Sequence, residues 1–259
     1  MAMPGDDEDG FEKFRRERIT GAVYFDIDQI ADQTSDLPHM IAGPEQFSVQ
    51  MGELGISEDD AIVIYDGSGL FSSARVWWNL RLMGAQNVRI LEGGFKAWKD
   101  GNYPTDTDAP KQPEPASFKA SFNPQQVISS SQLLDLINQG KGTILDARSL
   151  ARFNGSVDEP RKGLHSGHMP SAVSLPFTDL VSDGALISDD RLKQVIEPLL
   201  ANGEPIVTTC GSGVTAAVLS MALTSAGYDS HRLFDGSWTE WGNPDSDFPI
   251  IKNNADDPV

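Results

Sequence analysis

The chain has 259 residues, of which 39% are hydrophobic and 22% are charged, a balance typical of a globular protein with one large domain or two of ordinary size. Its 38 acidic residues outnumber its 20 basic residues, which gives a formal net charge of −18. A surface of that sign repels nucleic-acid phosphates and anionic membranes, so we expect neither as a partner. An anionic substrate needs a local cluster of arginines that reverses the field at its site.

The sequence also argues against several locations and kinds of site. Its first ten residues, Met-Ala-Met-Pro-Gly-Asp-Asp-Glu-Asp-Gly, lack the basic and then apolar order of a signal peptide. No apolar run approaches the ~20 residues that span a bilayer. We therefore expect a soluble cytoplasmic protein. One cysteine excludes an internal disulfide, and four scattered histidines argue against a structural metal site, so we expect no cofactor.

The chain carries an internal repeat. Residues 61–69 read Ala-Ile-Val-Ile-Tyr-Asp-Gly-Ser-Gly and residues 205–213 read Pro-Ile-Val-Thr-Thr-Cys-Gly-Ser-Gly, which aligns Asp66 with Cys210 at an offset of 144. Further along, residues 88–95 match residues 231–238 at an offset of 143. Two matches in the same order at nearly one offset indicate a duplicated domain.

Each copy is predicted to contain an apolar strand, a glycine turn, an amphipathic helix and another strand. In the first copy, nothing before Gly21 matches the strand predicted at 143–147, so that strand is either absent from this chain or drawn from elsewhere. The elements predicted for the second copy are, in chain order, helix 131–138, strand 143–147, strand 172–175, helix 189–201, strand 206–209, helix 214–226 and strand 232–234. This alternation predicts an α/β fold with tandem domains, each a mostly parallel sheet with helices on both faces.

The segment between the two copies has the composition of a linker. Five prolines stand among charged and polar residues between positions 103 and 126. We therefore predict an N-terminal domain over 1–106, a linker over 107–126 and a C-terminal domain over 127–259.

Cys210 is the strongest candidate for a reactive group. It follows the predicted strand 206–209, and ligands of open α/β sheets bind outside the carboxyl ends of strands. The glycine-rich run 211–215 can direct backbone N–H groups to one point, and the next helix adds its positive end, which favours a reactive thiolate. One alternative is a buried structural cysteine. Another is a phosphatase, whose loop usually closes with an arginine, whereas Ala216 and Ala217 stand at this helix start.

The run Cys-Gly-Ser-Gly-Val-Thr at 210–215 resembles the active-site loop of the 3-mercaptopyruvate sulfurtransferases, which have tandem rhodanese-like domains. The resemblance extends from Ile19 to Trp241 and includes Asp-Gly-Ser-Trp at 235–238. It implies that the second domain is catalytic and that the first is a degenerate copy. Asp66 fits this division, because a carboxylate cannot carry a persulfide, and we expect it to form hydrogen bonds within its own turn.

The resemblance also implies which residues bind the substrate. By position, Arg152 and Arg161 match two substrate-binding arginines of the family, and guanidinium groups suit a planar carboxylate and ketone. The alternative for both is salt bridging at the surface with Asp158 or Glu159. The other expected substrate-binding residues lie in the cysteine loop: Gly211, Gly213, Val214 and Thr215.

Three further positions match a proton relay of the family: Ser212, His39 and Asp28. In such a relay a carboxylate orients a histidine, and the histidine polarises a hydroxyl group. The alternative is that His39 is structural. His168, by contrast, resembles a structural turn of the fold.

The expected reaction is a sulfur transfer in two stages. Sulfur passes from 3-mercaptopyruvate to Cys210, giving a persulfide and pyruvate, and then to a thiol such as thioredoxin or a small thiol, or to cyanide. Thiosulfate is the alternative donor, disfavoured by the uncharged Gly211 and Ser212. A non-catalytic sulfur carrier of the rhodanese type is the alternative from another class.

Overall fold

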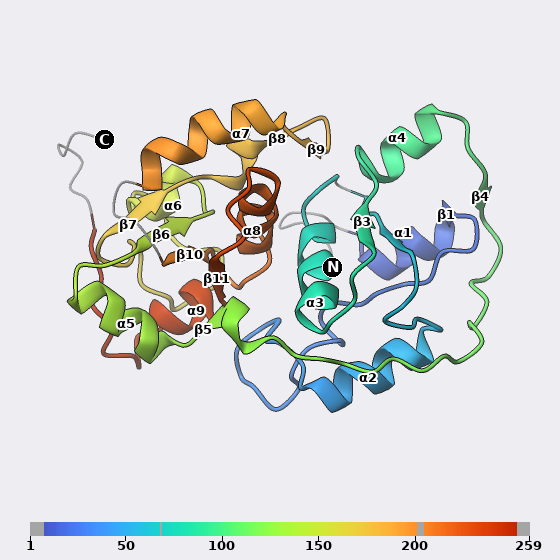
Figure 1. The fold of residues 1–259 in the computed structure, drawn as a ribbon, viewed down its shortest axis with the longest axis horizontal. Helices are drawn as coiled ribbons and strands as arrows, with labels where there is room; N and C mark the ends of the chain where they lie inside the picture. Colours follow the sequence, from blue (N-terminus) through green and yellow to red (C-terminus); the bar gives the residue numbers. More distant parts are fainter. Residues whose placement is uncertain (1–7, 68, 201–204, 253–259) are drawn as a thin grey trace. The chain divides into compact units, whose positions relative to one another are not determined.

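The structure, a computed structural model, forms two compact units (Figure 1). The described residues are 8–67, 69–200 and 205–252. The first unit comprises residues 1–123 with 183–185, and the second comprises residues 124–182 with 186–259. Residues 1–7, which belong to the first ten residues used above to argue against a signal peptide, lie outside the described part. No helix of the described part has the length and apolar character needed to cross a membrane.

The second unit is built on a five-stranded sheet in the order β5-β11-β10-β6-β7, in which every neighbouring pair is parallel. Its strands are β5 (Val127–Ile128), β6 (Thr143–Asp146), β7 (Ala172–Ser174), β10 (Ile206–Thr209) and β11 (His231–Phe234). Its helices are α5 (Ser130–Asn138), α6 (Leu150–Phe153), α7 (Asp189–Ile196), α8 (Ala216–Ser225) and α9 (Ser237–Trp241). Shorter elements are η1 (Pro124–Gln126), η2 (Phe177–Leu180), η3 (Glu197–Leu200), β8 (Val181–Ser182) and β9 (Ala185–Leu186).

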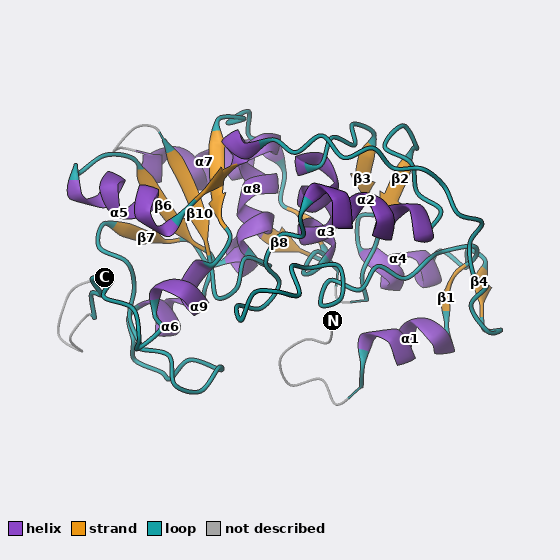
Figure 2. Ribbon diagram, turned by 90° about the horizontal axis from the view of Figure 1, so that it is seen from below, coloured by secondary structure: helices purple, strands orange, loops and turns teal. Residues whose placement is uncertain are grey.

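Helices cover both faces of this sheet, as predicted (Figure 2). Side chains alternate between the faces along each strand. Ile144, Val207 and Phe234 pack in one core with residues of α5 and α9. On the other face α8 contacts β10 and β11, and Thr208 is hydrogen-bonded to Ser220 of α8 at 2.9 Å. Cys210 is the residue after β10, so it lies at the carboxyl end of a strand that is buried throughout.

The predicted elements of the second unit lie within two residues of the observed bounds, with one exception. The helix predicted over 189–201 ends at Ile196, and a 3-10 turn follows at Glu197–Leu200. The prediction was wrong over this last turn because Pro198 has no N–H to donate within an α-helix. Ala201, the last residue of that prediction, lies outside the described residues.

The first unit is built on a shorter sheet, in which β2 (Ile62–Ile64) and β3 (Val88–Ile90) pair in parallel. At the offsets of the repeat, β2 corresponds to β10 and β3 to β11. Two short strands, β1 (Arg18–Ile19) and β4 (Thr105–Asp106), pair antiparallel. The helices are α1 (Gly10–Arg16), α2 (Pro44–Glu53), α3 (Ser73–Leu82) and α4 (Gly94–Asp100). Among the described residues, the first unit has no strand in the place that β6 holds in the second.

The proline-rich segment 107–126 lies against the first unit for most of its length. Phe118 is buried, and the Ala116 N–H donates to the carbonyl of Gly52 at 2.9 Å. A Cβ atom at Gly52 would lie 2.7 Å from the Ala116 carbonyl oxygen, so the close approach of the two backbones requires glycine. The division between the units follows Asn123.

Candidate active site

Cys210 is buried, with 2% of its surface exposed, in the loop between β10 and α8. Gly213 has φ 78°, a left-handed conformation that lets the loop reverse before the helix. The loop is fastened to α9, because the N–H of Trp238 donates to the Cys210 carbonyl at 3.0 Å and that of Thr239 to the Gly211 carbonyl at 2.9 Å. The cysteine therefore lies on a backbone held from the sheet and from a neighbouring helix.

Ser237 holds the same loop from inside. Its hydroxyl oxygen accepts hydrogen bonds from the N–H groups of Cys210 at 3.2 Å and Gly213 at 3.1 Å. The hydroxyl donates to the carbonyl of Phe234 at 2.9 Å. Ser237 is fully buried with φ 48°, which is strained for a residue other than glycine. Sequence reasoning missed this role. One signal was present, because the repeat aligns Ser237 with Gly94 and so places a serine where the other copy has glycine.

In the corresponding loop of the first unit, backbone amides bind a carboxylate. One carboxylate oxygen of Asp66 accepts hydrogen bonds at 2.9 Å from each of three successive N–H groups, those of Phe71, Ser72 and Ser73. The expected hydrogen bonding of Asp66 within its own turn is confirmed. At the offset of 144, these amides correspond to those of residues 215–217 at the start of α8. In the first unit the fold therefore directs backbone donors towards the position that corresponds to Cys210.

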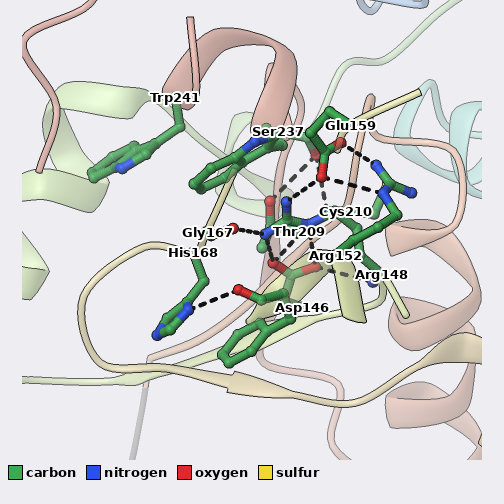
Figure 3. Close-up of polar contacts among 12 residues, drawn as sticks. Asp146, Arg148, Arg152, Glu159, Gly167, His168, Thr209, Cys210, Ser237 and Trp241 are labelled. Atoms are coloured by element: carbon green, nitrogen blue, oxygen red, sulfur yellow. Dashed lines mark hydrogen bonds and ion pairs between the residues drawn. The ribbon is translucent and has the colours of Figure 1, made fainter. Parts of the chain in front are cut away.

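A buried network of charged side chains lies beside the cysteine loop (Figure 3). Arg148 forms ion pairs with Asp146 at 2.6 Å and with Glu159 at 2.9 Å, and it donates to the Gly167 carbonyl at 2.9 Å. Its guanidinium carbon lies 4.1 Å from the ring centre of Trp238. These contacts fix Glu159 and complete the end of the sheet, a structural role for Arg148.

Arg152 of α6 extends from this network to the cysteine loop. Its guanidinium is bound by both oxygens of Glu159, with Nη2–Oε2 at 2.5 Å and Nε–Oε1 at 3.2 Å. A Cβ atom at Gly211 would lie 2.9 Å from Arg152 Nη2, so the guanidinium lies directly over the loop. The salt bridge considered for Arg152 therefore exists, but with a carboxylate that is itself buried and bound to Arg148. Sequence reasoning named Glu159 as an alternative partner of Arg152 but missed that this carboxylate is buried and bound to Arg148.

Arg161, the second predicted substrate arginine, is exposed in the segment between α6 and β7. Its substrate role stays a prediction.

Two of the three predicted relay residues meet in the first unit. His39 Nε2 lies 2.9 Å from Asp28 Oδ1, and the His39 side chain is only 7% exposed. The carbonyl of His39 accepts from Arg75 at 2.7 Å, which fixes the backbone at φ 62°. Ser212, the third member, is buried in the second unit. The carboxylate–histidine half of the relay is therefore present, and the part played by Ser212 stays a prediction.

His168 has the structural role expected for it. Its Nδ1 lies 2.9 Å from the carbonyl oxygen of Phe153, and the two rings stack with centres 3.9 Å apart. Its backbone exchanges two hydrogen bonds with Ile251, at 2.8 and 2.9 Å. Burial lowers the pKa of His168 below its usual 6.5. The described residues contain no group of three or more side chains placed to hold a metal ion.

The fold and the loop together define a protein of two repeated α/β units with one cysteine-centred site, in the second unit. The family model of the rhodanese-like domain matches residues 7–101 and 129–244. The chain belongs to the rhodanese family, with two domains in tandem.

Relatives in this family carry names of sulfur-transferring enzymes. The chain is 41% identical to the 3-mercaptopyruvate sulfurtransferase of Escherichia coli strain K12 over 252 residues, covering 96% of this chain and 89% of that protein. It is 36% identical to the 3-mercaptopyruvate sulfurtransferase of Homo sapiens, covering 92% and 82% of the two proteins. The crystal structure of SseA from Escherichia coli, described as having the rhodanese fold, matches with a TM-score of 0.83 and 40% identity over 92% of this chain and 90% of that one.

Proposed function

We propose that the protein is a sulfurtransferase that takes sulfur from 3-mercaptopyruvate onto Cys210 and passes it to an acceptor. The observation that carries this proposal is the cysteine loop, whose counterpart in the first unit binds an anionic oxygen through three backbone amides. A persulfide is also an anion, and donors fixed in advance stabilise it without reorganisation. The relatives named as 3-mercaptopyruvate sulfurtransferases support the choice of donor.

In the first half of the reaction, Arg152 and Arg161 bind the carboxylate and the carbonyl oxygen of the substrate. The Cys210 thiolate attacks the substrate sulfur, a sulfur–sulfur bond forms and the carbon–sulfur bond breaks. Its electron pair leaves with pyruvate as the enolate, which takes up a proton through Ser212 and His39, with Asp28 orienting the imidazole.

The loop residues hold the loaded sulfur in this scheme. The amides of Gly211, Val214 and Thr215 face substrate and persulfide, and Gly213, whose N–H donates to Ser237, shapes the loop through its left-handed conformation. The absence of a side chain at Gly211 leaves the space that Arg152 occupies over the loop.

In the second half, a thiol such as reduced thioredoxin or a small thiol, or cyanide, attacks the outer sulfur and regenerates the Cys210 thiolate. The two half-reactions give ping-pong kinetics. The proposal also includes a cytoplasmic location and the absence of a resident cofactor. It divides the chain into a first domain over 1–106, a linker over 107–126 and a catalytic domain over 127–259.

Thiosulfate is a second candidate donor. Relatives in Arabidopsis thaliana are named thiosulfate/3-mercaptopyruvate sulfurtransferases, one of them 34% identical to this chain. The contact between Arg152 and Glu159 favours 3-mercaptopyruvate, because the carboxylate offsets part of the positive charge that a dianion requires. A non-catalytic sulfur carrier is the remaining alternative, and it predicts no turnover with either donor.

The test compares kcat/KM for 3-mercaptopyruvate and thiosulfate, with cyanide as the acceptor. We expect 3-mercaptopyruvate to be preferred by about tenfold or more. Glu159→Gln, which removes the offsetting charge, shifts the ratio towards thiosulfate, whereas Asp158→Asn at an exposed neighbour leaves it unchanged. If the unmodified protein uses thiosulfate equally well or better, the assignment of 3-mercaptopyruvate as the donor is wrong. If it turns over neither donor, the assignment as an enzyme is wrong.

A further inference from the structure

Arg75 is a buried arginine of the first unit to which the proposed reaction gives no role. It lies on α3 and is only 1% exposed. Its guanidinium carbon lies 5.0 Å from the ring centre of Trp78 on the same helix. Burial of a charged group costs free energy that packing alone does not repay. A buried arginine is therefore expected where it binds a specific partner.

The second unit shows that this helix position does not itself require a charge. The bounds of α3 and α8 differ by 143 residues, and the loops before the two helices match at an offset of 144. At these two offsets Arg75 corresponds to Val218 or to Leu219, which are both buried aliphatic residues. An aliphatic side chain fills the place in the other copy of the helix, so packing does not account for the arginine.

One partner of Arg75 is the backbone of His39. The guanidinium Nη2 donates to the His39 carbonyl oxygen at 2.7 Å. His39 has φ 62°, a left-handed conformation that is unfavourable for a residue with a side chain and persists where surrounding contacts hold it. Because a charged donor makes a strong hydrogen bond, this contact stabilises the strained conformation relative to a relaxed one.

The backbone conformation of His39 sets the direction of its imidazole. A change of φ from positive to negative values rotates the bond from Cα to Cβ relative to the chain. In the held conformation the His39 side chain is only 7% exposed, and its Nε2 lies 2.9 Å from Asp28 Oδ1. Asp28 is held separately, because Gln33 donates to the Asp28 carbonyl at 2.9 Å and the Asp28 N–H donates to Asp26 Oδ1 at 3.0 Å. The pairing of imidazole and carboxylate thus depends on two anchored backbones, one of which Arg75 anchors.

We infer that Arg75 is a positioning residue for the proton relay, which holds the His39 backbone so that the imidazole stays paired with Asp28. This inference rests on the proposed function, in which the enolate of pyruvate takes up a proton through Ser212 and His39. Arg75 exchanges no proton itself, because a guanidinium stays protonated at any ordinary pH. Its removal therefore slows the protonation step and leaves substrate binding unchanged.

The test measures the first half of the reaction, in which pyruvate is released in a single turnover without an acceptor. Arg75→Met removes the donor and the charge but keeps a long side chain. We expect it to slow pyruvate release by about tenfold, while the half-saturating concentration of 3-mercaptopyruvate changes by less than about twofold. The matched control is Arg81→Met, because Arg81 lies on the same helix with its guanidinium carbon 5.2 Å from the ring centre of Trp77. This control leaves the rate unchanged.

A double-mutant cycle separates positioning from a general effect on the fold. His39→Asn removes the imidazole, and we expect it to slow pyruvate release at least as much as Arg75→Met does. In the His39→Asn background, Arg75→Met then has no further effect, because its effect passes through the missing imidazole. If Arg75 only supports the fold, the two losses multiply instead.

The NMR chemical shift of the His39 ring nitrogen Nε2 gives a readout that does not depend on turnover. Its signal is assigned by its absence in His39→Asn. We expect the shift to move in Arg75→Met towards that of an unbound imidazole and to stay unchanged in Arg81→Met. Arg75→Lys is the second variant, because it keeps the buried charge and a donor. We expect it to retain part of both the rate and the shift.

The possible failures are distinguishable. Pyruvate release by Arg75→Met at the unmodified rate, losses that multiply in the cycle, or an unmoved His39 signal overturns the inference. An undiminished rate in His39→Asn removes the relay and the inference with it, while sulfur transfer to Cys210 stands. If the unmodified protein releases no pyruvate, the proposed function is wrong, and with it the reaction that Arg75 would serve.

Discussion

The two units build the same strand, turn and helix around different residues. In the first unit the carboxylate of Asp66 accepts hydrogen bonds from three amides of its own loop, so a side chain of the protein itself satisfies these donors. In the second unit a buried cysteine occupies that position, and Ser237 holds the loop where the first unit has Gly94. One backbone geometry is therefore structural when its anion is built in, and we propose that it becomes a reactive site when a cysteine that can gain and lose a sulfur atom takes that position.

Exchanging the reactive atom gives the largest expected effect. We expect Cys210→Ser to lower the sulfur-transfer rate by about a thousandfold or more, because a hydroxyl group does not form a persulfide. Asp66→Ser, at the matching position of the first unit, leaves kcat within about twofold while it lowers stability by about 1–3 kcal/mol through its unsatisfied amides. Steady-state rates and urea unfolding measure the two effects. Substantial turnover by Cys210→Ser contradicts the division of roles.

Adding one methyl group to each loop sharpens the comparison. A Cβ atom at Gly211 meets Arg152 Nη2 at 2.9 Å, whereas a Cβ atom at Gly67, the matching residue of the first unit, meets nothing within 4 Å. We expect Gly211→Ala to displace the guanidinium and to raise KM for 3-mercaptopyruvate by about tenfold, with a smaller change in kcat. Gly67→Ala is the control and leaves both constants unchanged. An unchanged KM in Gly211→Ala shows that Arg152 does not bind substrate from this position.

Removing the hydroxyl group that holds the cysteine loop makes the second unit resemble the first. Ser237→Gly relieves the strained φ of 48° but leaves the amides of Cys210 and Gly213 without their acceptor. We expect a net loss of about 1–2 kcal/mol in the free energy of unfolding, together with a moderately slower transfer. Denaturant unfolding of this variant beside Gly94→Ala, which alters the matching position, measures the loss. A gain in stability contradicts the role given to the hydroxyl.

The smallest expected effect concerns pH. At an offset of 150, His168 corresponds to Arg18, which is buried and ion-paired with Asp108. Burial lowers the pKa of His168, so the folded state favours the neutral ring. Its contribution to stability is therefore fully present above the usual pKa of 6.5 and is lost as pH falls below it. We expect the loss of stability between pH 8 and pH 5.5 to be smaller in His168→Asn than in the unmodified protein, as measured by thermal unfolding.

The sequence predicted what contiguous residues encode. Neighbouring residues encode the strand before Cys210, the glycines after it and the hydrogen bonding of Asp66. The internal repeat predicted the tandem α/β architecture. The burial of Glu159 and its contact with Arg148 depend instead on how residues 11 positions apart fold back, and the contact of Ser237 with Cys210 spans 27 positions.

The central claim is that Cys210 accepts one sulfur atom from 3-mercaptopyruvate, and the intact mass of the protein tests it directly. Because the chain has a single cysteine, the account predicts that the protein gains the mass of one sulfur atom after exposure to the donor. It also predicts that cyanide removes this mass and that Cys210→Ser never acquires it. An unmodified protein that shows no gain, or a Cys210→Ser variant that shows the same gain, contradicts the account.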